Sequence, residues 1–106
     1  MSLLEENAEI LGRMEKDGSD LGRSRSVDFS HVFATRVSAE KFAAECEADG
    51  FKIDVIETDG VADPWDVTVT VKMQPSAANV TSWEERFDIL ARRHGGRTDG
   101  WGFFTV

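Results

Sequence analysis

Cysteine, long apolar runs and positive charge are scarce in this chain, and each scarcity excludes a class of protein. Cys46 is the single cysteine among 106 residues, so no disulfide can join two parts of the chain. No apolar run approaches the ~20 residues of a transmembrane helix. Glu5, Glu6 and Glu9 stand where a secretory leader would be basic and apolar. We therefore expect a cytoplasmic protein with no membrane association, folded as one domain over residues 1–106.

Positive charge is outweighed by negative charge. Lysine and arginine number 12 against 20 acidic residues, which gives a net charge of −8. A chain with this balance repels the phosphate backbone, so direct binding to nucleic acid is not expected. An acidic surface suits a basic segment of a protein partner. The candidate docking residues are Glu45, Glu47, Asp49, Asp54, Glu57 and Asp59. The same acids also fit a surface that serves solubility alone.

Groups for catalysis and metal binding are few, and none forms a recognisable site. His31 and His94 do not stand at a metal-ligand spacing with each other or with Cys46. On its apolar helical stripe, Cys46 is expected to act as a small buried side chain. His31 lies between Phe29 and Phe33 on a core-facing register. No phosphate-binding, dinucleotide-binding or nucleophile motif occurs. We expect no enzyme activity, no cofactor and no metal.

Hydrophobic periodicity predicts three helices and four strands. An N-terminal helix over residues 3–16, within a segment 1–17, has an apolar stripe of Leu4, Ala8, Leu11 and Met14, and Gly18 is placed to end it. Strands are expected at residues 27–37, 51–55, 65–73 and 98–104. Ser38 is a suitable N-cap for a helix that runs to Asp49. Thr81 and Glu84 have the spacing of a capping box that opens the third helix.

The order of these elements predicts an α+β fold. Two βαβ-like halves follow the first helix, and right-handed crossovers leave room for one strand inside each half. The compact solution is a ferredoxin-like βαββαβ arrangement over residues 26–106, a four-stranded antiparallel sheet in the order 4-1-3-2 with two helices on one face. The expected core is Phe29, Phe33, Phe42, Ile53, Val55, Val67, Val69, Phe87, Trp101 and Phe103. The other face carries small or polar residues such as Thr68 and Thr70, and the first helix either covers it or packs on a second subunit.

The last strand has an unusual alternation. Gly100 and Gly102 fall on one side, and Trp101 and Phe103 fall on the other. Glycine weakens a strand and often marks a place where another group packs close to the backbone. We therefore expect a close neighbour at the glycine side of this strand and a core position for the tryptophan.

Three segments of the chain resemble a known family. Residues 14–20, Met-Glu-Lys-Asp-Gly-Ser-Asp, look like its helix end and turn, and residues 35–40, Thr-Arg-Val-Ser-Ala-Glu, look like its strand-to-helix junction. Residues 98–102, Thr-Asp-Gly-Trp-Gly, match its C-terminal signature. The family is that of the bacterial regulator of ribonuclease E activity B, RraB. The resemblance implies a ferredoxin-like fold and a non-catalytic protein that binds ribonuclease E and modulates RNA turnover. It also implies structural roles for the signature residues Asp17, Gly18, Ser19, Asp20, Asp99, Gly100, Trp101 and Gly102.

Three functional hypotheses follow. The first is an acidic, non-catalytic module that regulates a nucleic-acid-processing enzyme, such as a ribonuclease with basic segments, by binding to it. The second is a ligand-binding or enzymatic domain with a pocket around His31, Trp65 and Trp101, because this fold supports many functions. The third is a self-assembling module in which the open sheet face or the last strand pairs between copies, giving a homo-oligomer.

Overall fold

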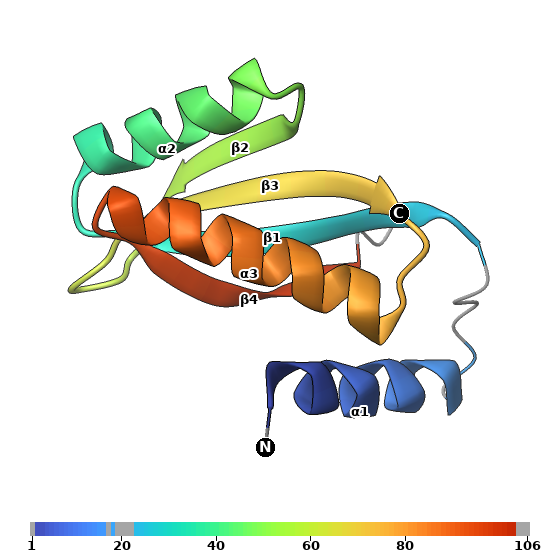
Figure 1. Ribbon diagram of the computed structural model, residues 1–106. Coiled ribbons are helices and arrows are strands. Elements are labelled where there is room, and N and C mark those ends of the chain that lie inside the picture. Colours follow the sequence, from blue (N-terminus) through green and yellow to red (C-terminus); the bar gives the residue numbers. More distant parts are fainter. Residues whose placement is uncertain (1, 17, 19–22, 104–106) are drawn as a thin grey trace.

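The computed structural model describes residues 2–16, 18 and 23–103. In this part of the chain, three helices and four strands follow one another in the predicted order (Figure 1). They are α1 (Leu3–Lys16), β1 (Arg25–Phe33), α2 (Arg36–Ala48), β2 (Lys52–Glu57), β3 (Trp65–Met73), α3 (Ala77–Arg93) and β4 (Arg97–Phe103). Hydrophobic periodicity therefore identifies every element, although several boundaries differ from the prediction.

The four strands form one antiparallel sheet in the order β2-β3-β1-β4. This is the predicted order read from the opposite edge, and it is consistent with a ferredoxin-like arrangement. Alternation positions the side chains: Val27, Phe29, His31 and Phe33 of β1 are buried, whereas the residues between them are partly exposed. Helices α2 and α3 cover the buried side of the sheet, as Figure 1 shows. We call this the helical side of the sheet.

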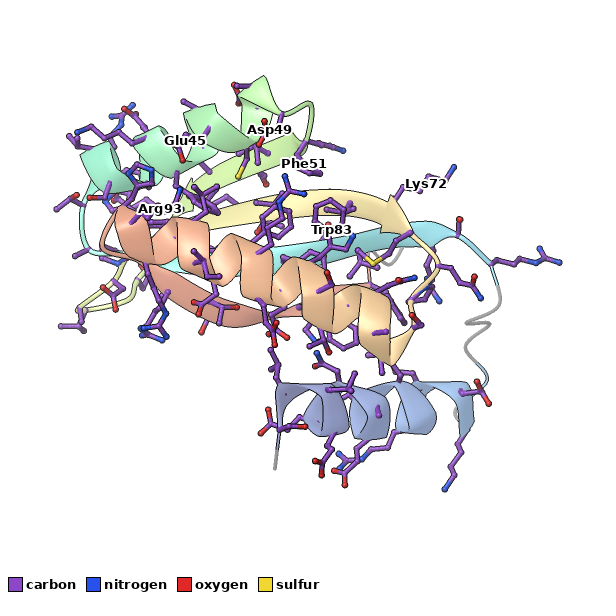
Figure 2. The ribbon with its side chains drawn as sticks, in the orientation of Figure 1. Glu45, Asp49, Phe51, Lys72, Trp83 and Arg93 are labelled. Atoms are coloured by element: carbon purple, nitrogen blue, oxygen red, sulfur yellow. The ribbon has the colours of Figure 1, made fainter. Side chains whose placement is uncertain are left out.

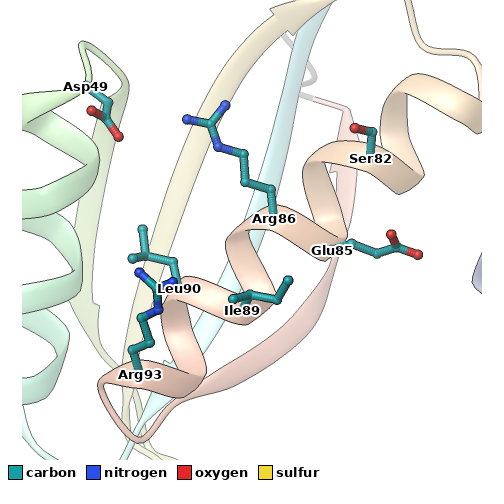
Figure 3. A pocket seen from close by; sticks show the side chains of 7 residues that line it. All are labelled: Asp49, Ser82, Glu85, Arg86, Ile89, Leu90 and Arg93. Carbon is teal, nitrogen blue, oxygen red and sulfur yellow. The ribbon is translucent and has the colours of Figure 1, made fainter.

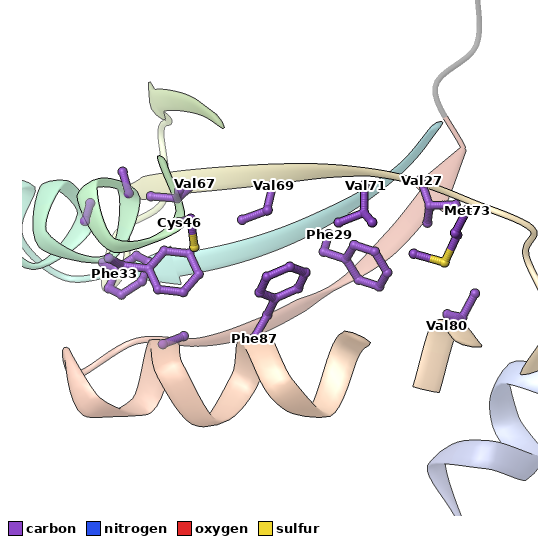
Figure 4. Close-up of a cluster of buried hydrophobic side chains, with 14 of the residues drawn as sticks. Val27, Phe29, Phe33, Cys46, Val67, Val69, Val71, Met73, Val80 and Phe87 are labelled. Atoms are coloured by element: carbon purple, nitrogen blue, oxygen red, sulfur yellow. The ribbon is translucent and has the colours of Figure 1, made fainter. Parts of the chain in front are cut away.

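The main hydrophobic core lies between the sheet and these two helices (Figure 4). Six of the predicted core residues are fully buried, namely Phe29, Phe33, Phe42, Val67, Val69 and Phe87. The ring centroids of Phe29 and Phe87 lie 5.5 Å apart, which joins β1 to α3. Four predicted members are buried less completely: Ile53, Trp101 and Phe103 are partly buried, and Val55 is 37% exposed. All four lie on β2 or β4, the two edge strands, where neighbours are missing on one side.

The two covering helices begin earlier than predicted. The N-cap of α2 is Thr35, whose hydroxyl accepts a hydrogen bond from the Ser38 N–H at 3.2 Å, and β1 accordingly ends before the predicted limit. The N-cap of α3 is Ser76. The predicted N-cap at Ser38 and the capping box of Thr81 and Glu84 are therefore wrong. Several hydroxyl side chains have suitable spacing for a cap. Thr81 and Glu84 lie inside the longer helix, where both accept hydrogen bonds from Asn7 of α1.

Helix α1 packs on α3 of the same chain and does not cover the other side of the sheet (Figure 1). Asn7 and Leu11 are buried there and Leu3 is partly buried. The first two members of the predicted stripe are exposed, Leu4 by 47%. The predicted burial of Leu4 and Ala8 is therefore wrong. The buried side of α1 runs through Leu3, Asn7 and Leu11, and the polar Asn7 interrupts the apolar pattern that would have revealed it. Among the described helices, none covers the side of the sheet opposite α2 and α3, which we call the uncovered face.

Glycines shape β4 for a reason other than the predicted one. Gly100 has a φ angle of +101°, and it lies where the pairing of β4 with β1 shifts register, as in a β-bulge. A Cβ on Gly100 or Gly102 would meet no described atom within 4 Å, so the predicted close neighbour is absent from this part of the structure. The close approach occurs at Gly96 instead, where a Cβ would overlap the ring of Phe33. Gly100 is therefore required by backbone conformation and Gly96 by packing.

Candidate protein-binding surfaces

The uncovered face carries carboxylates from all four strands. Asp28, Asp54 and Asp66 alternate with the core-facing residues of β1, β2 and β3. Burial raises the pKa of Asp66, and the hydrogen bond from Thr68 opposes this effect. The negative charges of Asp99 on β4 and of Asp54 raise the pKa of Asp66 further. Carboxylates on different strands of this face are thus close enough to repel one another.

Threonine side chains orient two of these carboxylates. Thr70 Oγ1 donates a hydrogen bond of 2.6 Å to Asp28, and Thr68 Oγ1 donates one of 3.0 Å to Asp66. A shallow hollow of about 470 Å³ lies on this face. Its lining includes Asp28, Lys52, Asp54, Thr68 and Thr70. The face therefore offers oriented acceptors for positively charged donors.

The structure divides the six predicted docking acids between two sides of the sheet. All six are exposed. Glu45, Glu47 and Asp49 belong to α2 and its C-cap, Asp54 and Glu57 to β2, and Asp59 to the loop that follows. Strand alternation directs Asp54 to the uncovered face and Glu57 to the helical side. Their role in binding stays a prediction, and it applies to two surfaces instead of one.

On the helical side, acids of α2 lie near bases of α3. Glu45 Oε2 is 3.2 Å from His94 Nε2. Asp49 lines a groove together with Arg86 and Arg93, and Figure 2 shows Glu45, Asp49 and Arg93 on these neighbouring helices. Lys52 likewise lies beside Asp28 and Asp54 on the uncovered face, so each surface combines acids with at least one base.

A buried polar cluster, not recognised from the sequence, joins α1 to α3 and β4. Asn7 is 2% exposed, and its Nδ2 donates to Thr81 Oγ1 at 2.9 Å and to Glu84 Oε1 at 3.1 Å. Trp101 Nε1 donates to Asn7 Oδ1 at 2.9 Å. Burial raises the pKa of Glu84, and the hydrogen bond from Asn7 opposes this effect. The position of Asn7 four residues after Leu3, on the side of the helix that is buried, was the available signal.

The family-signature residues that the structure describes lie at the end of α1 and along β4. Gly18 has a φ angle of +96°, and its N–H donates to the Glu15 carbonyl at 3.1 Å, as expected for a helix end. Asp99 is exposed, and Gly102 pairs with Asp28 across the strands. Trp101 is held by Asn7, as described above. The signature positions Asp17, Ser19 and Asp20 lie outside the described residues.

The hypothesis of a ligand pocket near His31, Trp65 and Trp101 requires an accessible imidazole, and His31 does not provide one. Its side chain is fully buried, and its ring centroid lies 4.9 Å from that of Phe42. Its Nδ1 donates to the Val67 carbonyl oxygen at 3.3 Å. Burial lowers the pKa of His31 to about 4, against the opposing effect of this hydrogen bond. The imidazole is therefore a neutral part of the core at pH 7.

Other reactive or metal-binding groups are not assembled in the described residues. Cys46 is buried, and burial raises its pKa to about 11, so its thiolate is scarce at neutral pH. Residues 2–16, 18 and 23–103 contain no group of three or more His, Cys, Asp or Glu side chains that could hold a metal ion. In the same ranges, no helix combines the length and the apolar character needed to cross a membrane.

Comparison with known proteins identifies the family. Among curated proteins, none matches the chain. Residues 4–103 match the model of the family RraB, described as regulator of ribonuclease activity B. The match extends from α1 to the end of β4, so it includes the uncovered face and the polar cluster around Asn7. The chain therefore belongs to the RraB family of regulators of ribonuclease activity.

Proposed function

We propose that this protein regulates a ribonuclease by binding to it directly, without catalysing a reaction itself. Family membership supplies the class of target. The observation that carries the proposal is the uncovered face, where Asp28, Asp54, Asp66 and Asp99 lie on four adjacent strands. A basic segment of the ribonuclease is the complementary partner for this surface.

The electrostatics of this face favour a cationic partner. Burial is the main cause that raises the pKa of Asp66, and the negative charges of Asp99 and Asp54 raise it further through repulsion between the carboxylates. Guanidinium or ammonium groups of a bound segment would relieve that repulsion. The net charge of −8 disfavours RNA as a direct ligand, because the protein repels the phosphate backbone. The ribonuclease, and not its RNA substrate, is therefore the proposed partner.

Direct binding can be tested with purified ribonuclease E and two matched double variants. Asp54→Asn with Asp99→Asn removes two charges from the uncovered face, and Glu47→Gln with Glu57→Gln removes two charges from elsewhere on the surface. We expect affinity to fall by about tenfold in the first variant and to change little in the second. Wild-type binding should also weaken when salt is raised.

Three outcomes would contradict parts of this proposal. Absence of binding at low salt would contradict direct regulation by binding. An equal loss of affinity in both double variants would remove the assignment to the uncovered face. Binding that neither variant changes would indicate that these acids serve solubility.

A further inference from the structure

A groove between α2 and α3 differs in character from the acidic uncovered face (Figure 3). Its volume is about 510 Å³. The α3 wall consists of Ser82, Glu85, Arg86, Ile89, Leu90 and Arg93, and Asp49 stands on the side of α2. Figure 3 shows the Glu85 side chain directed away from α2 and the Arg86 side chain directed towards it. The groove lies on the helical side of the sheet, so the proposed contact with a basic segment does not use it.

The α3 wall contains an exposed apolar strip. Ile89 is 59% exposed, and Leu90 beside it is partly buried. A single exposed isoleucine is common on protein surfaces. This one lies within a groove and between two arginines, which is the arrangement expected of a contact residue with a charged rim.

The two arginines of this wall are not used in ion pairs within the described residues. Neither Arg86 nor Arg93 has a carboxylate of that part of the chain within ion-pair distance, although Asp49 faces them across the groove. Four other arginines are paired: Arg13 with Glu9, Arg36 with Glu40, Arg92 with Asp88 and Arg97 with Asp63. The Arg86 guanidinium lies 5.0 Å from the ring centroid of Trp83, which restrains it. In a chain with net charge −8, two guanidinium groups without a carboxylate partner among the described residues are unusual.

The spacing of these residues indicates the shape of the ligand. Arg86, Ile89 and Arg93 occupy positions i, i+3 and i+7, which share one side of a helix. A rise of about 1.5 Å per residue places the two arginines about 10 Å apart along the axis. That separation exceeds the width of one phosphate or carboxylate, whereas it equals two turns of a second helix. The site therefore suits two separate anionic groups with an apolar group between them.

We propose that the groove binds an amphipathic helix of a protein partner that carries acidic residues two turns apart with an aliphatic residue between them. The acids would meet Arg86 and Arg93, and the aliphatic side chain would meet Ile89. Asp49 on the opposite wall favours a basic residue on the side of the bound helix that faces α2. This preference fixes the rotation of the bound helix about its own axis. A second copy of this chain is disfavoured as occupant because two molecules of charge −8 repel each other.

The proposal can be tested with a synthetic helix and fluorescence anisotropy. The probe is a labelled alanine-based peptide with glutamates at i and i+7 and leucine at i+3, and the control peptide has lysines in place of the glutamates. We expect saturable binding of the glutamate peptide, with a Kd below about 100 µM, and weaker binding of the lysine peptide. Ile89→Ser should weaken binding without any change in charge.

Matched variants separate the groove from general charge effects. Arg86→Gln with Arg93→Gln should weaken binding of the glutamate peptide by at least about fivefold. Arg13→Gln with Arg36→Gln removes the same charge elsewhere, and Asp54→Asn with Asp99→Asn alters the uncovered face, so both should leave peptide binding unchanged. Equal binding of the two peptides, or an equal loss in the Arg13 and Arg36 variant, would overturn the proposal. So would dimerisation of the wild type that Arg86→Gln with Arg93→Gln abolishes, because the occupant would then be a second copy.

Discussion

Replacement of His31 tests whether a buried neutral imidazole makes this fold sensitive to acid. Burial lowers the pKa of His31 from 6.5 to about 4, although the hydrogen bond to Val67 and the charge of Asp88 oppose the change. The contribution of His31 is fully present above pH 6.5 and is lost as pH falls towards the folded-state pKa, because the unfolded chain takes up the proton first. A difference of this size corresponds to about 3 kcal/mol of unfolding free energy.

The assay is urea unfolding, followed by circular dichroism from pH 7 to pH 4, for the wild type and for His31→Gln. Glutamine does not titrate, so the unfolding free energy of the wild type minus that of the variant should fall by about 3 kcal/mol over this range. His94→Gln is the matched control, because it removes the other histidine from a partly exposed site and leaves His31 in place, so the fall attributed to His31 should persist in it.

A direct titration of the His31 imidazole in the wild type, followed by nuclear magnetic resonance, tests the same quantity without a substitution. A pKa of His31 near 6.5 would refute the reasoning. So would a free-energy difference between the wild type and His31→Gln that stays constant as pH falls.

Three further substitutions test the polar cluster and the close packing at Gly96. Asn7→Ala removes the hydrogen bonds that Glu84 and Trp101 form with Asn7, so urea titration should show a loss of roughly 2–4 kcal/mol; a loss below about 0.5 kcal/mol would contradict this role. Burial raises the pKa of Glu84, so its favourable contribution is present at low pH and is lost as pH rises through the folded-state pKa. Glu84→Gln keeps the acceptor for Asn7 and should therefore be more stable than the wild type at pH 7, and this difference in unfolding free energy should shrink in acid. A difference that stays constant with pH would contradict this prediction. Gly96→Ala must displace the ring of Phe33 and should lower the melting temperature through a cost of roughly 1–3 kcal/mol, whereas an unchanged melting temperature would show that the ring moves freely.

The candidate surfaces could be predicted from the sequence only in part. Alternation in residues 65–73 is sufficient to direct Thr68 and Thr70 away from the core, because side chains on a strand alternate between its two sides. The same rule places Asp54 and Glu57 on opposite sides of β2 once its register is known. The prediction instead grouped all six acids by their proximity in the chain. Proximity in the chain does not determine which side of a sheet a side chain occupies.

The groove between α2 and α3 was not predicted from the sequence, for a related reason. Sequence reasoning predicted the third helix and assigned no binding role to its residues. Ile89 was visible as an apolar residue of that helix. Its significance depends on α2 standing opposite, and on Arg86 and Arg93 lacking carboxylate partners among the described residues, and both are properties of the folded chain.

The sequence by itself determines the order and type of the seven elements and the family, because periodicity, turn residues and short motifs are local properties. The strand order follows from that element order once right-handed crossovers are assumed. Only the tertiary structure decided where α1 packs, since an amphipathic helix fits the sheet, another helix or a second subunit equally well. Asn7 settles that choice through hydrogen bonds to α3 and to Trp101, which is 94 residues away. The packing of α1 on α3 leaves the acidic face of the sheet uncovered by any described helix, and that face is the proposed binding surface for the ribonuclease.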